Sequence, residues 1–385
     1  MDQQKRPVSL SRGNTSDQKI HALTSARFFA ALYVVIYHTR WGFNFQSLFG
    51  RIIELGYIAP YFFFLLSGYI LAVVYLKKQA RVPARRFFVS RFARIYPLFY
   101  LTMLMDLPFA LIARVAKYGF TVAAIRTASL LGLSTIMLQM CLPTLTIING
   151  ASWSLSIEAA FYLSFPLIGP LLWKLTGRRA LSASFLLYLG AIAIECLTIK
   201  LFGDARTNVS GYHLLQFEAV FACGILLARW ESASEVSKSP AVISDSLAWV
   251  VVILSMIAFG VCVWLYEPLN FSRLNVAYLL VPVYMSVTWV LAKSKILPVR
   301  LLGHPWLVVL GEASYGLYLI HTPVRHLFER FHLTGSPAQY PLYLTTCIAL
   351  SVLSFFYFET PSRRFILRKL HTQPKETREA ASAAQ

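Results

Sequence analysis

The sequence predicts an all-α protein, a polytopic bundle of about ten transmembrane helices with no soluble second domain. Hydrophobic residues make up 57% of the chain and charged residues only 14%, and the mean hydropathy is +0.58. A soluble domain would carry about a quarter charged residues. Apolar runs recur along the whole length, and each is long enough, at about 20 residues, to cross a ~30 Å hydrocarbon core.

The positions of the basic residues decide how many of these runs are expected to cross. The run 121–141 is an eleventh candidate, but it contains Arg126 and Gln139. The Lys- and Arg-rich segments all fall on one side of the membrane only if 121–141 does not cross, so 114–152 is expected to be an outside excursion. The ten expected spans are 22–39, 55–76, 92–113, 154–175, 180–201, 212–229, 246–266, 275–292, 306–328 and 341–358.

The residues outside the spans are expected to form tails and short loops. Residues 1–20 are polar and basic and lack the pattern of a cleavable signal, which predicts a disordered cytoplasmic tail. Residues 21–364 predict one membrane domain, and 365–385 a second cytoplasmic tail. We therefore expect a multi-pass protein of the inner (plasma) membrane with both termini in the cytoplasm.

The net charge of +19 does not indicate nucleic-acid binding. The basic residues cluster beside the ends of the apolar runs, where positive-inside topology needs them and where they meet lipid headgroups. The five cysteines lie mostly inside apolar runs and show no CxxC spacing, which indicates small core residues. We expect no nucleic-acid partner and no metal site.

The stretch 23–38 carries two ionisable side chains in an otherwise apolar helix, Arg27 and His38. They lie eleven residues apart, so they share one helix face and stand roughly 16 Å apart along the axis. Ionisable residues inside a membrane are costly and by default mark a functional site that faces the protein interior. The alternative is a plain membrane anchor with a snorkelling arginine.

The run that begins near Arg85 offers two further arginines, Arg91 and Arg94, at the expected cytoplasmic membrane edge. Their spacing of three places both guanidinium groups on one helix face. Guanidinium groups bind phosphate in a bidentate way, which favours a phosphate-bearing cosubstrate. The alternative is a topology signal that contacts lipid headgroups.

Two later segments place polar side chains on one helix face. Ser154, Glu158 and Tyr162 recur every four residues, and a carboxylate inside a span needs a cationic partner from another helix or serves as a structural ion pair. Ser314, Tyr318 and His321 share a face near the chain's end.

Further candidates, which the sequence does not rank, are the intramembrane carboxylates Glu195 and Glu218 and the Ser67–Gly68 pair, which suits close helix approach.

Six motifs in order resemble the acyltransferase 3 family over residues 20 to 364: Arg27 with His38, FFFLLSGYIL, RFARIYP, WSLSIEAAFYLSFPL, LGEASYGLYLIH and FETPSRR. The resemblance implies a polytopic membrane O-acyltransferase that moves an acyl group, usually acetyl from acetyl-CoA, to a hydroxyl of a surface glycan, an exported polysaccharide or a lipid-linked oligosaccharide. It implies His38, Glu158 and His321 as catalytic candidates. It implies Arg27, Arg91 and Arg94 as residues that bind acyl-CoA. One departure is Ala159, where the family often has a second acidic residue.

The residue types suit this chemistry. A sugar hydroxyl is a poor nucleophile while protonated, and histidine, with an ordinary pKa near 6.5, is a suitable base. The developing oxyanion needs donors, and Arg27, a tyrosine or a serine are candidates. Two routes stay open: direct transfer from a threaded acyl-pantetheine, or relay through an acyl-histidine. A different class stays open as well, a proton-coupled transporter that uses His38, Glu158, Glu195 and Glu218.

Overall fold

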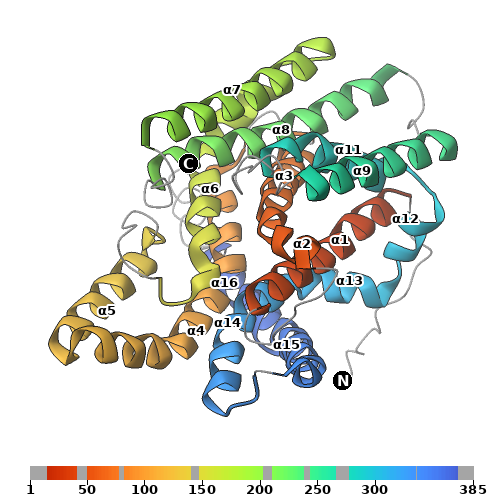
Figure 1. The fold of residues 1–385 in the computed structure, drawn as a ribbon. Coiled ribbons are helices and arrows are strands. Elements are labelled where there is room, and N and C mark those ends of the chain that lie inside the picture. Colours follow the sequence, from red (N-terminus) through yellow and green to blue (C-terminus); the bar gives the residue numbers. More distant parts are fainter. Residues whose placement is uncertain are drawn as a thin grey trace, which may run out of the picture.

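The computed structural model describes residues 15–40, 50–77, 82–139, 147–202, 210–237, 243–265, 277–334 and 336–371. Every regular element in these ranges is a helix, so the prediction of an all-α membrane fold is confirmed (Figure 1). Both tails, including all of 372–385, lie wholly or largely outside the described residues.

The helices follow one another in this order. The first half contains α1 (Thr15–Thr39), α2 (Gly50–Glu54), η1 (Leu55–Ile58), α3 (Ala59–Leu71), η2 (Ala72–Leu76), α4 (Ala84–Tyr118), α5 (Phe120–Thr135), η4 (Gly150–Ser152), α6 (Trp153–Trp173) and α7 (Arg178–Phe202). The second half contains α8 (Ser210–Ser237), α9 (Asp245–Leu265), α11 (Val281–Lys293), α12 (Leu297–Leu302), α13 (Pro305–Glu312), α14 (Ser314–Arg330), η6 (Pro337–Gln339), α15 (Tyr340–Ser354), η7 (Phe355–Glu359) and α16 (Thr360–His371). The segments η2 and η7 are π-helical.

Helices α1 and α3 lie near the centre of the molecule, with α7 and α8 on one side and α14 and α15 on the other (Figure 1). The most extensive helix pairing joins α3 to α8. Glycines permit it: a Cβ on Gly68 would stand 2.0 Å from the carbonyl oxygen of Phe221, and one on Gly224 would stand 2.0 Å from that of Leu65. The sequence expectation that Gly68 suits close helix approach is therefore confirmed.

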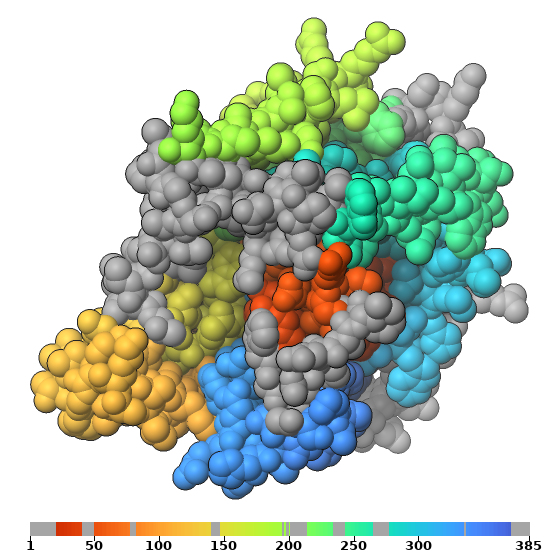
Figure 2. All heavy atoms as spheres, viewed as in Figure 1, coloured from red at the N-terminus to blue at the C-terminus, as the bar shows by residue number. Residues whose placement is uncertain are grey.

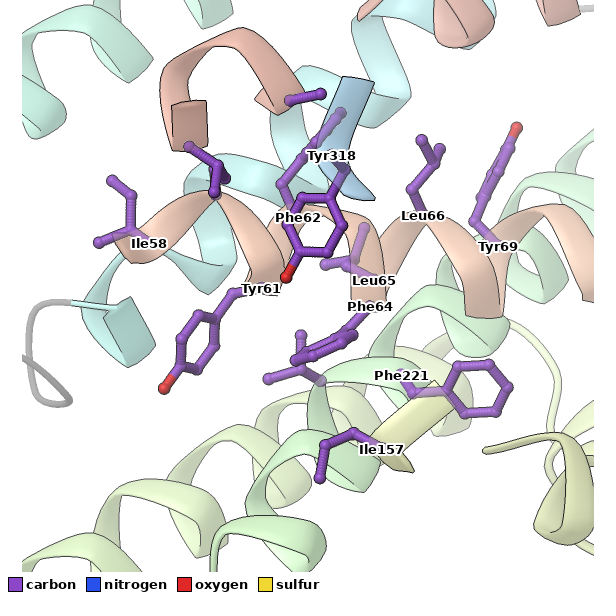
Figure 3. Packing of buried hydrophobic residues seen from close by; sticks show 14 of the residues in the cluster. Ile58, Tyr61, Phe62, Phe64, Leu65, Leu66, Tyr69, Ile157, Phe221 and Tyr318 are labelled. Atoms are coloured by element: carbon purple, nitrogen blue, oxygen red, sulfur yellow. The ribbon is translucent and has the colours of Figure 1, made fainter. Parts of the chain in front are cut away.

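Aromatic side chains fill the space around this crossing. The ring centroid of Phe64 lies 5.2 Å from that of Phe161 and 5.1 Å from that of Phe217. Figure 3 shows Phe64 reaching from α3 toward helices that carry Ile157 and Phe221. These contacts fix α3, α6 and α8 against one another, and α3 and α6 each supply residues to the site described below.

Five helical stretches of the described residues are long and apolar enough to cross a membrane: Gly50–Leu76, Ala84–Tyr118, Gly150–Trp173, Asp245–Trp264 and Pro337–Leu370. They cover five of the ten expected spans, and shorter or less apolar helices cover the others. The number ten therefore stays a prediction. Over 121–141 the structure has α5, whose 16 residues fall short of the ~20 that a straight crossing needs.

The expected span 306–328 is wrong in one respect, because it consists of two helices. Helix α13 ends at Glu312 and α14 begins at Ser314, with Ala313 between them at φ −75° and ψ −5°. The close approach of α13 to α1 accompanies this break: a Cβ on Gly311 would stand 2.1 Å from the carbonyl oxygen of Thr24. The break leaves Glu312 and Ser314 on the wall of one cavity.

Segments that are distant in sequence meet on the face shown in Figure 2. Red and orange residues from the first 76 residues show at its middle, between the blue residues of the C-terminal helices and the green and cyan residues that follow Ile243. Large apolar side chains stay exposed on α7 and α9, among them Leu186 and Met256. Such a surface suits lipid as its surroundings, so the protein is a membrane protein.

Candidate active site

A cavity of about 200 Å³ lies where α1, α3, α4, α6, α13 and α14 meet. It is lined by apolar residues of α3, by three arginines and two glutamates, and by serine and tyrosine hydroxyls. The charged residues are Arg27, Arg91, Arg94, Glu158 and Glu312, and the hydroxyl-bearing ones are Thr24, Ser67, Ser154, Tyr162, Ser314, Tyr315 and Tyr318. The formal charge of the wall is therefore one positive unit, which favours an anionic ligand.

Helix α4 brings Arg91 and Arg94 to the cavity on one face, as their spacing predicts. The hydroxyl of Tyr315 donates to the carbonyl oxygen of Ile95 at 2.8 Å and ties α14 to this turn of α4. The guanidinium carbon of Arg91 lies 5.8 Å from the ring centroid of Tyr162. Arg91 Nε is buried and has no hydrogen-bond partner among the described residues.

Helix α6 brings Ser154, Glu158 and Tyr162 to the same wall, so the prediction that they share a face is confirmed. The Tyr162 hydroxyl donates a short hydrogen bond to Glu158 Oε1. The segment before α6 is anchored on α14, because the Asn149 side chain donates to the carbonyl oxygen of Leu319 at 3.0 Å. The carboxylate of Glu158 thus shares the cavity with arginines from α1 and α4.

The two candidate histidines contact each other, which the sequence did not predict. His38 Nδ1 lies 2.9 Å from His321 Nε2, and the two rings meet edge to edge at an interplanar angle of 23°, with centroids 5.1 Å apart. His321 is 1% exposed, whereas His38 is only partly buried. In a hydrogen bond between two neutral imidazoles one nitrogen donates and the other accepts, so one proton lies between His38 and His321.

Neither histidine lines the cavity, and Tyr318 lies between the two regions. Its hydroxyl is 2.9 Å from Ser154 Oγ on the cavity wall. Its ring centroid lies 6.2 Å from that of His321, one turn further along α14. The predicted grouping of Ser314, Tyr318 and His321 on one face therefore serves both regions, since two of its members line the cavity and the third meets His38.

The structure divides the expected site residues into two groups. Arg27, Arg91, Arg94 and Glu158 come together at the cavity, and His38 and His321 come together beside it. Their roles in binding and catalysis stay predictions.

The remaining candidates lie away from both groups or outside the described side chains. Glu218 accepts a short hydrogen bond from Ser164. The side chain of Glu195 lies outside the described residues, and so does Cys141. Ser67 lines the cavity, next to the close crossing at Gly68.

Several residues at or near the site were not singled out from the sequence. Glu312 lines the cavity, although only its motif was noted. Asp106 in α4 is 0% exposed and contacts His326, which lies beside Arg325. The available signal was the rarity of charge inside an apolar run, which applies to Asp106 as much as to Glu158.

Comparison with known proteins identifies the family of this chain. A family model described as an acyltransferase domain, of the acyltransferase 3 type, matches residues 20–356. The chain is 31% identical over 327 residues to acyltransferase MdmB of Streptomyces mycarofaciens, covering 79% of this chain and 78% of that protein. It is 27% identical over 362 residues to a putative peptidoglycan O-acetyltransferase, YrhL, of Bacillus subtilis.

The match to YrhL covers 89% of this chain and 55% of that protein, so the chain spans about half of YrhL's length. A putative O-acetyltransferase of Staphylococcus aureus is 23% identical over 417 residues, covering 95% of this chain and 61% of that protein. No solved structure matches the chain. The resemblance seen in the sequence motifs is confirmed over nearly the whole chain, which therefore belongs to the acyltransferase 3 family of membrane acyltransferases.

Proposed function

We propose that this protein moves an acyl group, in the simplest case acetyl, from acyl-CoA to a hydroxyl of a surface or exported glycan or its lipid-linked precursor. The observation that carries the proposal is the pairing of an arginine-rich cavity with a histidine pair, joined through Tyr318. The cavity offers donors for an anionic cosubstrate, and the histidines offer a base for the hydroxyl.

The cavity suits a part of the donor rather than the entire molecule. Its volume of about 200 Å³ is below the roughly 300–1,000 Å³ typical of pockets for drug-sized ligands. We assign Arg91 and Arg94, with Arg27 deeper on α1, to the phosphates and carbonyls of acyl-CoA. The apolar wall from α3, including Phe63, Phe64 and Ile70, suits the acyl group and the pantetheine arm.

His38 is assigned as the base because it is only partly buried, whereas its partner His321 is enclosed. A side chain that is 1% exposed has no room for a sugar, so His321 holds the tautomer of His38 and shares its proton. Glu158 is assigned to the charge balance of the cavity. Tyr318 and Ser154 are assigned to the oxyanion, because their hydroxyls adjoin each other at the cavity wall.

The proton and bond changes balance in either route. In direct transfer His38 takes the proton of the acceptor hydroxyl, whose oxygen bonds to the thioester carbonyl carbon. The carbon–sulfur bond breaks, and the histidine pair returns the proton to the leaving thiolate. In the relay route a nitrogen of His38 bonds to the acyl carbon, the carbon–sulfur bond breaks, and the imidazole proton goes to the leaving thiolate. The acceptor oxygen then bonds to the acyl carbon, the carbon–nitrogen bond breaks, and the hydroxyl proton returns to the imidazole.

Release of coenzyme A by the purified protein tests the assignment of the donor. Protein in detergent or vesicles is given acetyl-CoA, with and without a polysaccharide acceptor, and free thiol is measured. We expect thiol release in wild type and its loss in His38→Ala. Thiol release that persists in the variant removes His38 from the mechanism. If wild type releases no thiol from acetyl-, succinyl- or longer acyl-CoA, the assignment of acyl-CoA as the donor is contradicted.

The orientation in the membrane belongs to the same proposal. We propose that the protein lies in the inner membrane with ten spans and both termini in the cytoplasm, because Lys and Arg then gather on one side. Reporter fusions along the chain measure this. A reporter placed after Gly177 is expected to read cytoplasmic, and an extracytoplasmic reading there contradicts the ten-span arrangement.

A further inference from the structure

A chain of polar contacts runs from α4 through α14 to the end of α1. Asp106 Oδ1 lies 2.6 Å from His326 Nδ1. His326 Nε2 lies 3.2 Å from Arg325 Nη2, and Arg325 Nη1 donates to the carbonyl oxygen of His38 at 3.2 Å. This series of contacts therefore ends on the backbone of His38, one of the two paired histidines.

The donors and acceptors of this chain fix the tautomer of His326. A guanidinium only donates, so His326 Nε2 must accept from Arg325. His326 Nδ1 then carries the proton and donates to Asp106. A neutral imidazole thus bridges a carboxylate and a guanidinium. Asp106 is 0% exposed and its Oδ2 has no hydrogen-bond partner among the described residues, so this bridge is needed to offset a buried charge.

The contact with His38 acts on the last turn of α1. The carbonyl of His38 is one of the final four of α1, which lack a partner within the helix. A cation is favourable at this end of a helix dipole. Arg325 therefore satisfies an open acceptor and sets the position of the backbone that carries the imidazole of His38.

The partner histidine is held in a matching way. The Tyr343 hydroxyl, from α15, donates to the carbonyl oxygen of His321 at 2.9 Å. Each histidine backbone is thus held by a side chain from another helix. Arg325 lies one turn after His321 on α14, so the helix that carries His321 also carries the group that holds His38. The two contacts thus hold the backbones on either side of the 2.9 Å separation between the imidazole nitrogens.

We propose that Arg325, oriented by Asp106 and His326, is a positioning residue that keeps His38 in reach of His321 for acyl transfer. Asp106 and His326 act only through Arg325. This inference rests on the proposed function, since it presumes that the histidine pair transfers the proton. It predicts that the three residues affect turnover and leave donor binding in the cavity unchanged.

Substitution of Arg325 separates positioning from a general structural role. A misplacement of about 1 Å costs on the order of a hundredfold in rate, so Arg325→Gln is expected to lower kcat by tenfold to a hundredfold. The KM for acyl-CoA and the Tm should stay near wild type. Arg325→Lys should recover part of kcat, because an ammonium still donates to the carbonyl of His38. Glu329→Gln is the matched control, since it removes the partly exposed partner of Arg325 Nε at 3.4 Å and leaves the inner contacts intact.

A double-mutant cycle tests whether Asp106 and Arg325, at the two ends of this series of contacts, act together. Asp106→Asn and Arg325→Gln should each lower kcat, and the double variant should lose little more than either alone, because coupled neighbours are not additive. If the Arg325→Gln protein does not fold, measurements of kcat, KM and Tm on His326→Gln test the inference instead. A wild-type kcat in the folded variant overturns the inference. So does a fall in kcat that comes with a raised KM for acyl-CoA and a lowered Tm.

The two proposals fail in different ways. If His38→Ala retains turnover, the proposed function fails for the histidine pair, whatever Arg325 does. If His38→Ala loses turnover and Arg325→Gln does not, the histidine pair stands and only the positioning role of Arg325 is contradicted.

Discussion

The cavity and the histidine pair differ in almost every physical respect, although α1 and α14 contribute to both. The cavity gathers five charged side chains from four helices. The histidine pair consists of two imidazoles, one of them fully buried. Helix α1 supplies Arg27 to the first region and His38 to the second, and α14 supplies Tyr318 and then His321.

This difference teaches how the protein separates binding from proton transfer. Along α1 the two regions stand roughly 16 Å apart, at ~1.5 Å per residue over eleven residues. Both α1 and α14 run from the cavity toward the histidines in chain order, and each carries residues of both regions. Substitutions at the cavity should therefore change KM, and substitutions at the pair should change kcat.

The largest expected effect tests the histidine pair. His38→Ala should lower kcat by at least ~10², the lower end for loss of an acid–base group, while acyl-CoA binding stays at the wild-type level. Steady-state acetylation and equilibrium binding of acetyl-CoA measure the two quantities. His304→Ala removes an exposed histidine and is the control. Product formation within a few-fold of wild type would remove His38 from the mechanism and contradict the role of the histidine pair.

A smaller effect is expected at the junction of the two regions. Tyr318→Phe removes the hydroxyl beside Ser154 and keeps the ring that packs near His321. We expect kcat to fall by about tenfold, less than the ~10² of a lone oxyanion donor, because Ser154 stays in place. Tyr315→Phe is the control that removes a cavity hydroxyl bonded to the backbone of α4. Equal kcat values for the two variants would contradict a special role for Tyr318.

The smallest effect on turnover is expected at the cavity. Substituting Arg91 and Arg94 together by Gln should raise the KM for acyl-CoA about tenfold and leave kcat nearly unchanged, because the lost contacts are charge-assisted hydrogen bonds to phosphate. High salt should narrow the difference from wild type. The double variant Arg85→Gln, Arg86→Gln is the matched control on the exposed start of α4. If both double variants behave alike, the inner arginines are only a topology signal.

The helical fold and the shared helix faces of several cavity residues were predictable, since both depend on local sequence. Continuous apolar runs predict helices, and spacings of three and four predict shared faces for Arg91 with Arg94 and for Ser154 with Glu158. These faces do line one cavity. The resemblance to a family added the expectation that Arg27 belongs with them.

The pairing of His38 with His321 was not predictable, because it joins residues 283 positions apart and depends on how α1 packs on α14. The same holds for the contact of Asp106 with His326, which depends on the packing of α4 against α14. The break at Ala313 was missed because Gly311 and Ala313 permit a continuous helix by local pattern. Only the approach of α13 to the backbone of Thr24 distinguishes two separate helices from one continuous helix.

The π-helical segments η2 and η7 have a consequence for how the chain tolerates deletions. Each holds one residue more per turn than an α-helix, and each continues directly from an α-helix, α3 or α15. Deleting one residue within 355–359 would convert the π-turn into regular α-helix and leave the orientation of the helix beyond it nearly unchanged, because a π-turn already accommodates one extra residue. Helix α16 would then keep its packing against α4. A one-residue deletion there is expected to be less damaging than one within α15, where it would rotate everything beyond it by about 100°.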